Sequence, residues 1–481
     1  MKIKSLKFGA KSNQMEKIKS SLRDSRGGRW LVLVLVSVTM LCSYYLTDAL
    51  APLEQRLEMQ LGWDAVDYGL FSGGYGWFNV FLLMLIFSGM FLDKVGTRIA
   101  GVSAIVVMLI GAGIKYWAVK GNVGSDILSF NLFGWELISA KRSAVYAGLG
   151  FAVFGVGTEL FGITANKAVV RWFRGKEMAL AIGLNTSTGR IGTALAMFTP
   201  LPLVQLTGNI GAPVLVAMLL MCVAFLIFFL FIIMDRRLDK EEQAKGFVSE
   251  EEFKLSDVVK VIKIRAFWYI TVLCLLFYAA VFPFIKYATN LIMQKFEVSE
   301  QFAGYIPALL PLGALFLTPF FGSVYDRKGK GATIMITGSV LLLCVHLLFS
   351  IPSLNSLYVA IALVILLGVA FSMVPSAMWP SVAKIIPEQR LGTAYALTFW
   401  VQNWGIMLVP MLIGYVLREY CVTGTAEKVI DGQTLEVSLY NYTPPMLIFA
   451  CFGLLSILFA WLLKKEDKKK GYGLEEPNEN N

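Results

Sequence analysis

Two residues of opposite charge, Glu159 and Arg190, lie in the middle of long apolar stretches of this 481-residue sequence. Charged side chains are costly at the centre of a bilayer, about 2.5–3.5 kcal/mol each on insertion scales, so each one marks a functional site by default. Glu159 and Arg190 are 15 and 16 residues from Arg174, which lies in the turn between their segments. Since a helix rises about 1.5 Å per residue, two antiparallel helices joined there would place both charges at one depth.

These two charges predict a site for a small zwitterion. A guanidinium binds a carboxylate through two parallel hydrogen bonds, so Arg190 would hold the carboxylate of the ligand while Glu159 holds its amine. The alternative is structural: the two side chains pair only with each other and brace their helices. The two interpretations are compatible, since a pair that opens to admit a zwitterion keeps both charges neutralised.

Asp48 and Lys286 form a second pair of candidates. Each lies 18 residues after a tryptophan, Trp30 or Trp268, that opens its apolar segment. Opposite charges at equivalent positions near the outer ends of two helices predict an outward gate, in which a salt bridge breaks as the helices separate. The alternative is that each side chain reaches water independently.

The elements that must position these residues are membrane-spanning helices. The sequence is 57% hydrophobic and 16% charged, whereas soluble domains carry about 25% charged residues. A span needs about 20 apolar residues, and the apolar runs lack the strict alternation of barrel strands. The pattern predicts an all-α membrane protein with twelve helices, near residues 30–50, 66–92, 98–118, 144–170, 178–205, 211–235, 266–293, 301–324, 331–351, 354–384, 390–418 and 443–464. Turn residues in the loop 419–442 indicate a hairpin, whereas residues 121–140 are expected to form a longer outward loop without a hairpin signal.

The helices fall into two sets of six with matching landmarks. Gly89-x3-Asp93 and Gly322-x3-Asp326 are 233 residues apart and follow the second and eighth spans. The repeat predicts two pseudo-symmetric six-helix bundles, which in transporters enclose a substrate site at the membrane midplane. The expected segments are a basic tail 1–29, a first bundle 30–235, a linker 236–265 containing a short amphipathic helix, a second bundle 266–464 and a tail 465–481.

Polar and aromatic side chains are expected to complete the site. By the repeat, Arg190 corresponds to Asn403, so that Asn403 and the adjacent Gln402 would face the charges from the second bundle. Packing or interface anchoring is the alternative for each aromatic residue. The aromatic candidates for the lining are Tyr44, Tyr75, Trp77, Tyr278 and Trp379.

The net charge of +10 does not indicate a nucleic-acid partner. The Lys and Arg residues concentrate before residue 30, between residues 236 and 265, and after residue 463, as the positive-inside rule places them. Both termini are therefore expected in the cytosol. The span 31–50 is too long for a secretory signal and lacks a cleavage motif.

Catalysis, cofactors and metals have no support in the sequence. The six cysteines are widely spaced, and the one histidine, His346, lies inside an apolar run where packing is its simplest role. No phosphate-binding loop, nucleophile elbow or Cys/His cluster occurs. We therefore expect neither an enzyme nor a resident cofactor.

The repeated loop Gly-x3-Asp-Lys/Arg-x-Gly resembles the signature of the major facilitator superfamily. In that superfamily it forms a tight cytosolic turn whose aspartate pairs with a basic residue and latches the outward-open state. A simple positive turn is the alternative, and it accounts poorly for two copies. The resemblance assigns gating roles to Asp93, Lys94, Arg98, Asp326 and Arg327. The outward gate at Asp48 and Lys286 is predicted from their spacing alone, and the relatives are expected to be uncharged at the position of Lys286.

Further segments resemble one branch of the superfamily, the lysosomal dipeptide uniporter family and its bacterial relatives. The resemblance implies uniport of dipeptides by alternating access, with peptide contacts at Glu159 and Arg190. It rests on Tyr68-Gly-Leu-Phe, Gly76-Trp-Phe-Asn-Val, Arg171-Trp-Phe-Arg-Gly-Lys-Glu, Gly189-Arg-Ile-Gly, residues 278–284, Trp379-Pro380, residues 387–395 and Gln402-Asn403.

The sequence departs from the animal members of this family in its first 29 residues. These are basic and contain no acidic dileucine sorting motif, whereas the animal proteins carry such a signal and work with a glycosylated lumenal partner. We therefore expect a monomer without that partner, in a bacterial cytoplasmic membrane, or in a lysosomal membrane if the source is eukaryotic.

Several functions remain open on the residues alone. A dipeptide uniporter, including one for peptides with cationic side chains, fits both charges of the site. An organic-anion or sugar-phosphate exchanger would use Arg190 and Lys286, with Glu159 then poorly placed. A proton-coupled symporter would titrate Glu159, and a transport-dead sensor would bind ligand without moving it.

Overall fold

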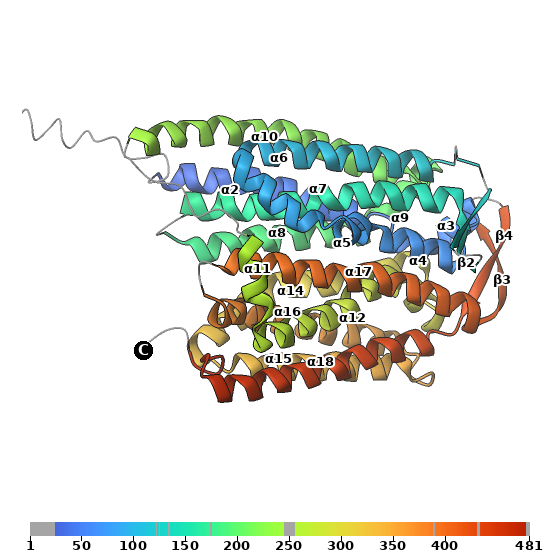
Figure 1. The fold of residues 1–481 in the computed structure, drawn as a ribbon. Coiled ribbons are helices and arrows are strands. Elements are labelled where there is room, and N and C mark those ends of the chain that lie inside the picture. The colour runs from blue at the N-terminus through green and yellow to red at the C-terminus, as the bar shows by residue number, and fades with distance from the viewer. Residues whose placement is uncertain are drawn as a thin grey trace, which may run out of the picture.

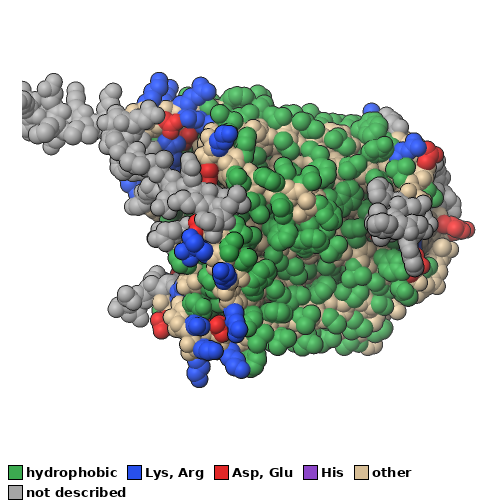
Figure 2. All heavy atoms as spheres, viewed as in Figure 1, with side chains coloured by type: hydrophobic (Ala, Val, Ile, Leu, Met, Phe, Trp, Pro, Cys, Tyr) green, Lys and Arg blue, Asp and Glu red, His purple; other side chains and the backbone are tan. Residues whose placement is uncertain are grey.

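The computed structural model describes residues 25–121, 123–124, 126–132, 135–173, 176–244, 255–387, 390–430 and 433–477. Its helices run along one common direction, and two β-hairpins lie together at one end (Figure 1). We call this the hairpin end, and the opposite end, where α2 begins and α18 stops, the terminal end. Figure 2 shows hydrophobic side chains over the middle of the molecule and Lys and Arg side chains gathered at the terminal end.

The first half extends from α2 to α10. A kink at Gly96 divides α6 into the end of the second span and the whole of the third. The elements are α2 (Arg26–Asp48), η1 (Ala51–Leu53), α3 (Glu54–Leu61), α4 (Ala65–Gly73), η2 (Gly74–Gly76), α5 (Trp77–Phe81), α6 (Met84–Val119), β1 (Ile127–Leu132), β2 (Trp135–Lys141), α7 (Arg142–Phe173), α8 (Met178–Phe198), α9 (Pro200–Thr207) and α10 (Ala212–Ala244).

The second half repeats this order after a short connecting helix, α11 (Leu255–Ile262). Its elements are α12 (Arg265–Lys295), α13 (Glu300–Tyr305), η3 (Ile306–Ala308), α14 (Leu309–Lys328), α15 (Gly331–Ser350), α16 (Leu357–Ile385), α17 (Leu391–Tyr420), β3 (Val422–Ile430), β4 (Gln433–Tyr440) and α18 (Thr443–Lys470). Within the described residues, ten helices are long and apolar enough to cross a membrane. The other two expected spans are the segmented stretch from α4 to the start of α6, and α8. The all-α membrane architecture is thus confirmed.

Three local expectations need correction. The span expected at 66–92 is broken into α4, η2, α5 and the start of α6, by a 3₁₀ turn at Gly74–Gly76 and by Leu83, whose φ of 53° interrupts the helix. The loop 121–140 contains the antiparallel hairpin β1–β2. Helix α10 continues to Ala244, past the expected bundle boundary at 235, and its last turns carry Asp235 and Asp239 into ion pairs with Arg98 and Arg171.

The hairpin expected within 419–442 is confirmed as β3–β4. Its turn residues 431–432, the turn at 174–175 and most of the N-terminal tail and linker lie outside the described residues. The expected amphipathic linker helix corresponds to α11.

The repeated loop has the same backbone feature in both halves. Gly96 has φ 78° and Gly329 has φ 66°, a region that side chains other than glycine disfavour. The two glycines are 233 residues apart, so the repeat that is visible in the sequence preserves a backbone turn.

The halves pack closely at the hairpin end through α4 of the first half and α17 of the second. Gly69 and Gly73 of α4 lie against the α17 backbone, where an added Cβ would be 2.6 Å from the Pro410 oxygen and 2.4 Å from the Met407 oxygen. On α17, a Cβ at Gly414 would be 2.2 Å from the Ala65 oxygen. Small residues of this kind allow membrane helices to approach closely.

We therefore expect Gly414→Val to destabilise this arrangement. The added side chain would overlap the α4 backbone, and overpacking of this kind costs about 1–3 kcal/mol. The melting temperature of the purified protein, measured by intrinsic fluorescence, should fall. Gly113→Val on α6, where no atom lies within 4 Å of the added Cβ, is the control and should change it little; equal effects would contradict the close-packing argument.

Candidate functional site

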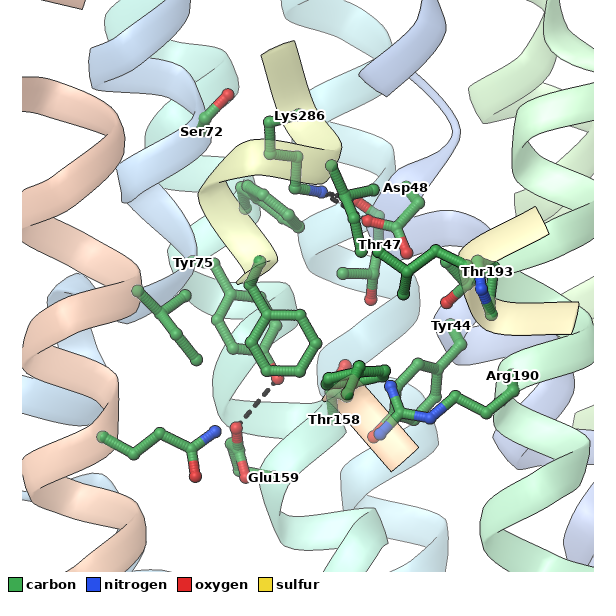
Figure 3. A pocket seen from close by; sticks show the side chains of 18 of the residues that line it. Tyr44, Thr47, Asp48, Ser72, Tyr75, Thr158, Glu159, Arg190, Thr193 and Lys286 are labelled. Atoms are coloured by element: carbon green, nitrogen blue, oxygen red, sulfur yellow. Dashed lines mark hydrogen bonds and ion pairs between the residues drawn. The ribbon is translucent and has the colours of Figure 1, made fainter. Parts of the chain in front are cut away.

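A cavity between the two halves contains the charged residues that the sequence singled out (Figure 3). The space in it that atoms do not fill, open solvent included, is about 870 Å³. The first half contributes Tyr44, Thr47, Asp48, Ser72, Tyr75, Phe151, Thr158, Glu159, Arg190 and Thr193 to the lining. The second half contributes Phe282, Ile285, Lys286, Leu310, Pro311, Phe371, Phe399, Gln402 and Ile406.

Glu159 enters the cavity from α7. The Tyr75 hydroxyl donates a hydrogen bond of 2.9 Å to Glu159 Oε1, and the side chain of Asn403 lies next to the same carboxylate. Figure 3 shows Tyr75 and Glu159 joined in this way, with Lys286 and Asp48 further toward one side of the cavity. Glu159 is thus held by neutral groups.

Arg190 enters the same cavity from α8. Its guanidinium lies over the ring of Phe371, 4.5 Å from the centroid, and 6.0 Å from that of Phe282. Both phenylalanines belong to the second half, and such cation–π contacts stabilise a guanidinium without using its N–H donors. Among the described residues, no ion pair joins Arg190 to Glu159, so the mutual brace is not the arrangement found here.

Four of the expected lining residues lie outside the lining. Tyr278 stacks behind Phe282 at 5.1 Å, and Trp379 Nε1 donates to the Tyr278 hydroxyl at 3.4 Å. Trp77 packs against Gly148, and Asn403 is fully buried, donating to the Phe399 carbonyl of its own helix at 3.0 Å. A sequence gives the depth of a side chain in a span more readily than the direction it faces.

The sequence pattern did not identify the phenylalanines that line the cavity. Phe282 lies within the segment 278–284 that supported the family resemblance, and Phe371 precedes Ser372, the counterpart of Glu159 in the repeat. The repeat could therefore have pointed to Phe371. Phe151 had no comparable signal.

Asp48 and Lys286 close the cavity toward the hairpin end. Lys286 Nζ lies 2.6 Å from Asp48 Oδ1 and donates to the Thr47 carbonyl at 3.0 Å. Helix α2 stops at Asp48, ahead of a 3₁₀ turn that contains Pro52, and the last carbonyls of a helix lack partners within it. Lys286 from the second half therefore neutralises Asp48 and caps this helix end at once.

Further polar contacts join the halves beyond this ion pair. They place α3 and α4 of the first half against α13, α17 and the β3–β4 hairpin of the second. Lys428 belongs to that hairpin, and its partial burial lowers the pKa of its amine. The contacts are Arg56 to Glu300 at 2.8 and 2.9 Å, Arg418 to Asp64 at 3.3 Å, Lys428 to Gln55 at 2.9 Å, and the Ser438 hydroxyl to Glu58 at 2.6 Å.

At the terminal end, the described ion pairs run within one half. Asp93 pairs with Lys167 at 2.6 Å, and Arg98 pairs with Asp235 and Asp239. Of the other expected gating residues, Lys94 and Arg327 are exposed, and Asp326 is partly buried near Lys384. The structure is therefore closed at the hairpin end.

The fold and the central charged cavity define a membrane carrier. The family model "Major Facilitator Superfamily" matches residues 33–410, and the chain belongs to this superfamily, whose members are transporters and not enzymes.

Relatives and solved structures agree with this assignment. The chain is 28% identical to the human "Lysosomal dipeptide transporter MFSD1" over 81% of this chain and 80% of that protein. It is 29% identical to the Escherichia coli "Inner membrane transport protein YdiN" over 26% of this chain and 28% of that one. The fold is similar to that of a bacterial homologue of the human lysosomal transporter Spinster in an inward-facing, unoccupied conformation, with a TM-score of 0.65 and 15% identity over 92% of this chain and 98% of that chain.

We expect Asp48 and Lys286 to affect the stability of the protein as the two partners of a buried ion pair. Asp48→Asn alone leaves the Lys286 ammonium unpaired, which costs on the order of 3–5 kcal/mol, and Lys286→Met removes the ion pair that joins Asp48 to the second half. The melting temperature should fall in each single variant and recover substantially in the double variant, because replacing both partners removes both charges. A double variant less stable than either single one would show that the pair is not the dominant contact of these side chains.

Proposed function

We propose that the protein transports dipeptides by alternating access, as a uniporter. The observation that carries this proposal is that Glu159 and Arg190 face one cavity without pairing with each other. Each is held by uncharged groups, the Tyr75 hydroxyl or the rings of Phe371 and Phe282. Their charges therefore remain available to a ligand that carries both signs.

A dipeptide has the complementary charges at its two ends. Its carboxylate accepts two parallel hydrogen bonds from the Arg190 guanidinium, while its ammonium group donates to Glu159. The aromatic and aliphatic walls of the cavity accept side chains of varied shape without specific hydrogen bonds. The relatives named as lysosomal dipeptide transporters support this substrate class.

The arrangement of charges supports uniport in preference to proton coupling. Asp48, the other carboxylate of the cavity, is already neutralised by Lys286. No further carboxylate is among the described lining residues, so Glu159 has no acidic neighbour with which to share a proton. In uniport, the gradient of the peptide itself sets the direction of net flux.

The basic terminal end indicates the orientation. Cationic loops face the cytosol in multi-pass proteins, so the terminal end and both termini lie in the cytosol and the hairpin end faces outward. Because the cavity is closed at the hairpin end, the structure then represents a state from which ligand would be released to the cytosol. It is formed within one chain, which supports a functional monomer, and the compact loops favour a bacterial cytoplasmic membrane.

A thermal-shift titration of purified protein with dipeptides tests the proposal. A ligand that binds the native state raises the melting temperature by mass action. Dipeptides should stabilise the wild type, whereas Arg190→Ala and Glu159→Gln should each weaken binding by about 10- to 100-fold, as expected for one lost charge-assisted contact. Arg265→Ala, at the exposed start of α12, is the control and should bind like the wild type.

Uptake into liposomes then separates transport from sensing. Labelled dipeptide should enter vesicles that contain the wild type without an imposed proton gradient. Stabilisation by sugar phosphates that requires Arg190 but not Glu159 would replace the proposal with an anion exchanger. Binding without flux would indicate a sensor.

A further inference from the structure

Lys115 is a buried lysine that the proposed substrate site does not use. It lies near the end of α6, where a lysine commonly extends along the helix to reach water. Here its side chain points inward and is fully buried. Its Nζ donates to the Leu46 carbonyl at 3.1 Å and lies 4.4 Å from the centroid of Phe151 and 5.1 Å from that of Phe71.

The Leu46 carbonyl belongs to the last turn of α2, directly beside the ion pair that closes the cavity. Lys286 from the second half occupies the next carbonyl along, Thr47, together with the Asp48 carboxylate. Both side-chain nitrogens also lie over one ring, that of Phe151, at 4.4 and 5.6 Å from its centroid. Two lysines, one from each half, thus meet at the same negatively polarised helix end.

Opening the hairpin end must separate these two lysines. Lys286 is on α12 and moves with the second half, whereas Asp48 and Lys115 belong to the first half and stay together. A buried carboxylate that loses its only cation is strongly unfavourable. Rotation of the flexible Lys115 side chain from the Leu46 carbonyl toward Asp48, two residues further along α2, would prevent this.

We propose that Lys115 replaces Lys286 as the counter-ion of Asp48 when the hairpin end opens. The inference rests on the alternating access of the proposed function, but not on the identity of the substrate. Lys115 is then a positioning residue of the gate: it lowers the energy of the outward-open state and contributes little to the closed one.

A labelling experiment measures opening without any substrate. Thr193, a buried residue of the cavity lining, is replaced by cysteine in a protein whose native cysteines are removed. Right-side-out sealed vesicles are treated with a membrane-impermeant maleimide, which reaches residue 193 only when the hairpin end opens. The variants are Lys115→Met, Lys286→Met and, as the matched control, Lys120→Met, an exposed lysine five residues further along the same segment.

We expect Lys115→Met to slow labelling at least about tenfold while its melting temperature stays at or above that of the wild type, because the closed state loses only a buried amine. Lys286→Met should speed labelling, and Lys120→Met should match the wild type. In an Asp48→Asn background, Lys115→Met should have no further effect, since no carboxylate then needs a counter-ion.

Two results would overturn the proposal. One is labelling of Lys115→Met at the wild-type rate. The other is a lowered melting temperature together with an undiminished effect in the Asp48→Asn background, which would make Lys115 a general structural residue. Maleimide labelling reports opening of the hairpin end directly and needs no substrate. Both labelling results could therefore be interpreted even if the dipeptide titration failed.

Discussion

The cost of holding charge away from water governs how the two halves of this carrier meet. At the hairpin end, Asp48 and Arg56 pair with Lys286 and Glu300 across the boundary between the halves. At the terminal end, Arg98 and its acidic partners on α10 belong to one half. The terminal ends can therefore separate without breaking these pairs, whereas opening the hairpin end requires new partners for buried charges. This difference accounts for a structure that is closed at the hairpin end.

The proposed substrate site follows the opposite rule. Glu159 and Arg190 are charged residues within spans, yet each is stabilised by uncharged neighbours. A hydroxyl and an aromatic face lower the cost of the charge without neutralising it, so under the proposed function an incoming zwitterion would gain two full ion pairs. Had the two residues paired with each other, a ligand would first have had to break that pair. The arrangement found here leaves more of the interaction energy to the ligand.

The sequence predicted those features that depend on polarity and periodicity. Long apolar runs gave the spans, the repeat gave two halves, and equal spacing from a turn brought Glu159 and Arg190 into one cavity. It did not reveal features that depend on which way a residue faces. Lys115 lies near the end of an expected span, where reaching water was the simplest outcome, and only the interruption of α2 after Asp48 exposes the carbonyl that it binds. The placement of Tyr278 and Trp379 behind Phe282 depends likewise on the rotation of their helices, which spacing alone does not fix.

The proposed substrate site and the proposed gate are connected through one aromatic ring. Glu159 accepts a hydrogen bond from Tyr75, and the Tyr75 ring makes a T-shaped contact with the Phe151 ring, with the centroids 5.4 Å apart. The side-chain nitrogens of Lys115 and Lys286 both lie over the Phe151 ring. An ammonium group that binds Glu159 competes with the Tyr75 hydroxyl, and a displaced Tyr75 alters the surface against which both lysines rest. Coupling requires an element with two arrangements that both sites bias. The boundary between the halves is such an element, because Lys286 leaves Phe151 when the hairpin end opens while Tyr75 and Lys115 remain with the first half. Under both proposals, binding at Glu159 and exchange of the counter-ion at Asp48 would then act on the same equilibrium between closed and open states.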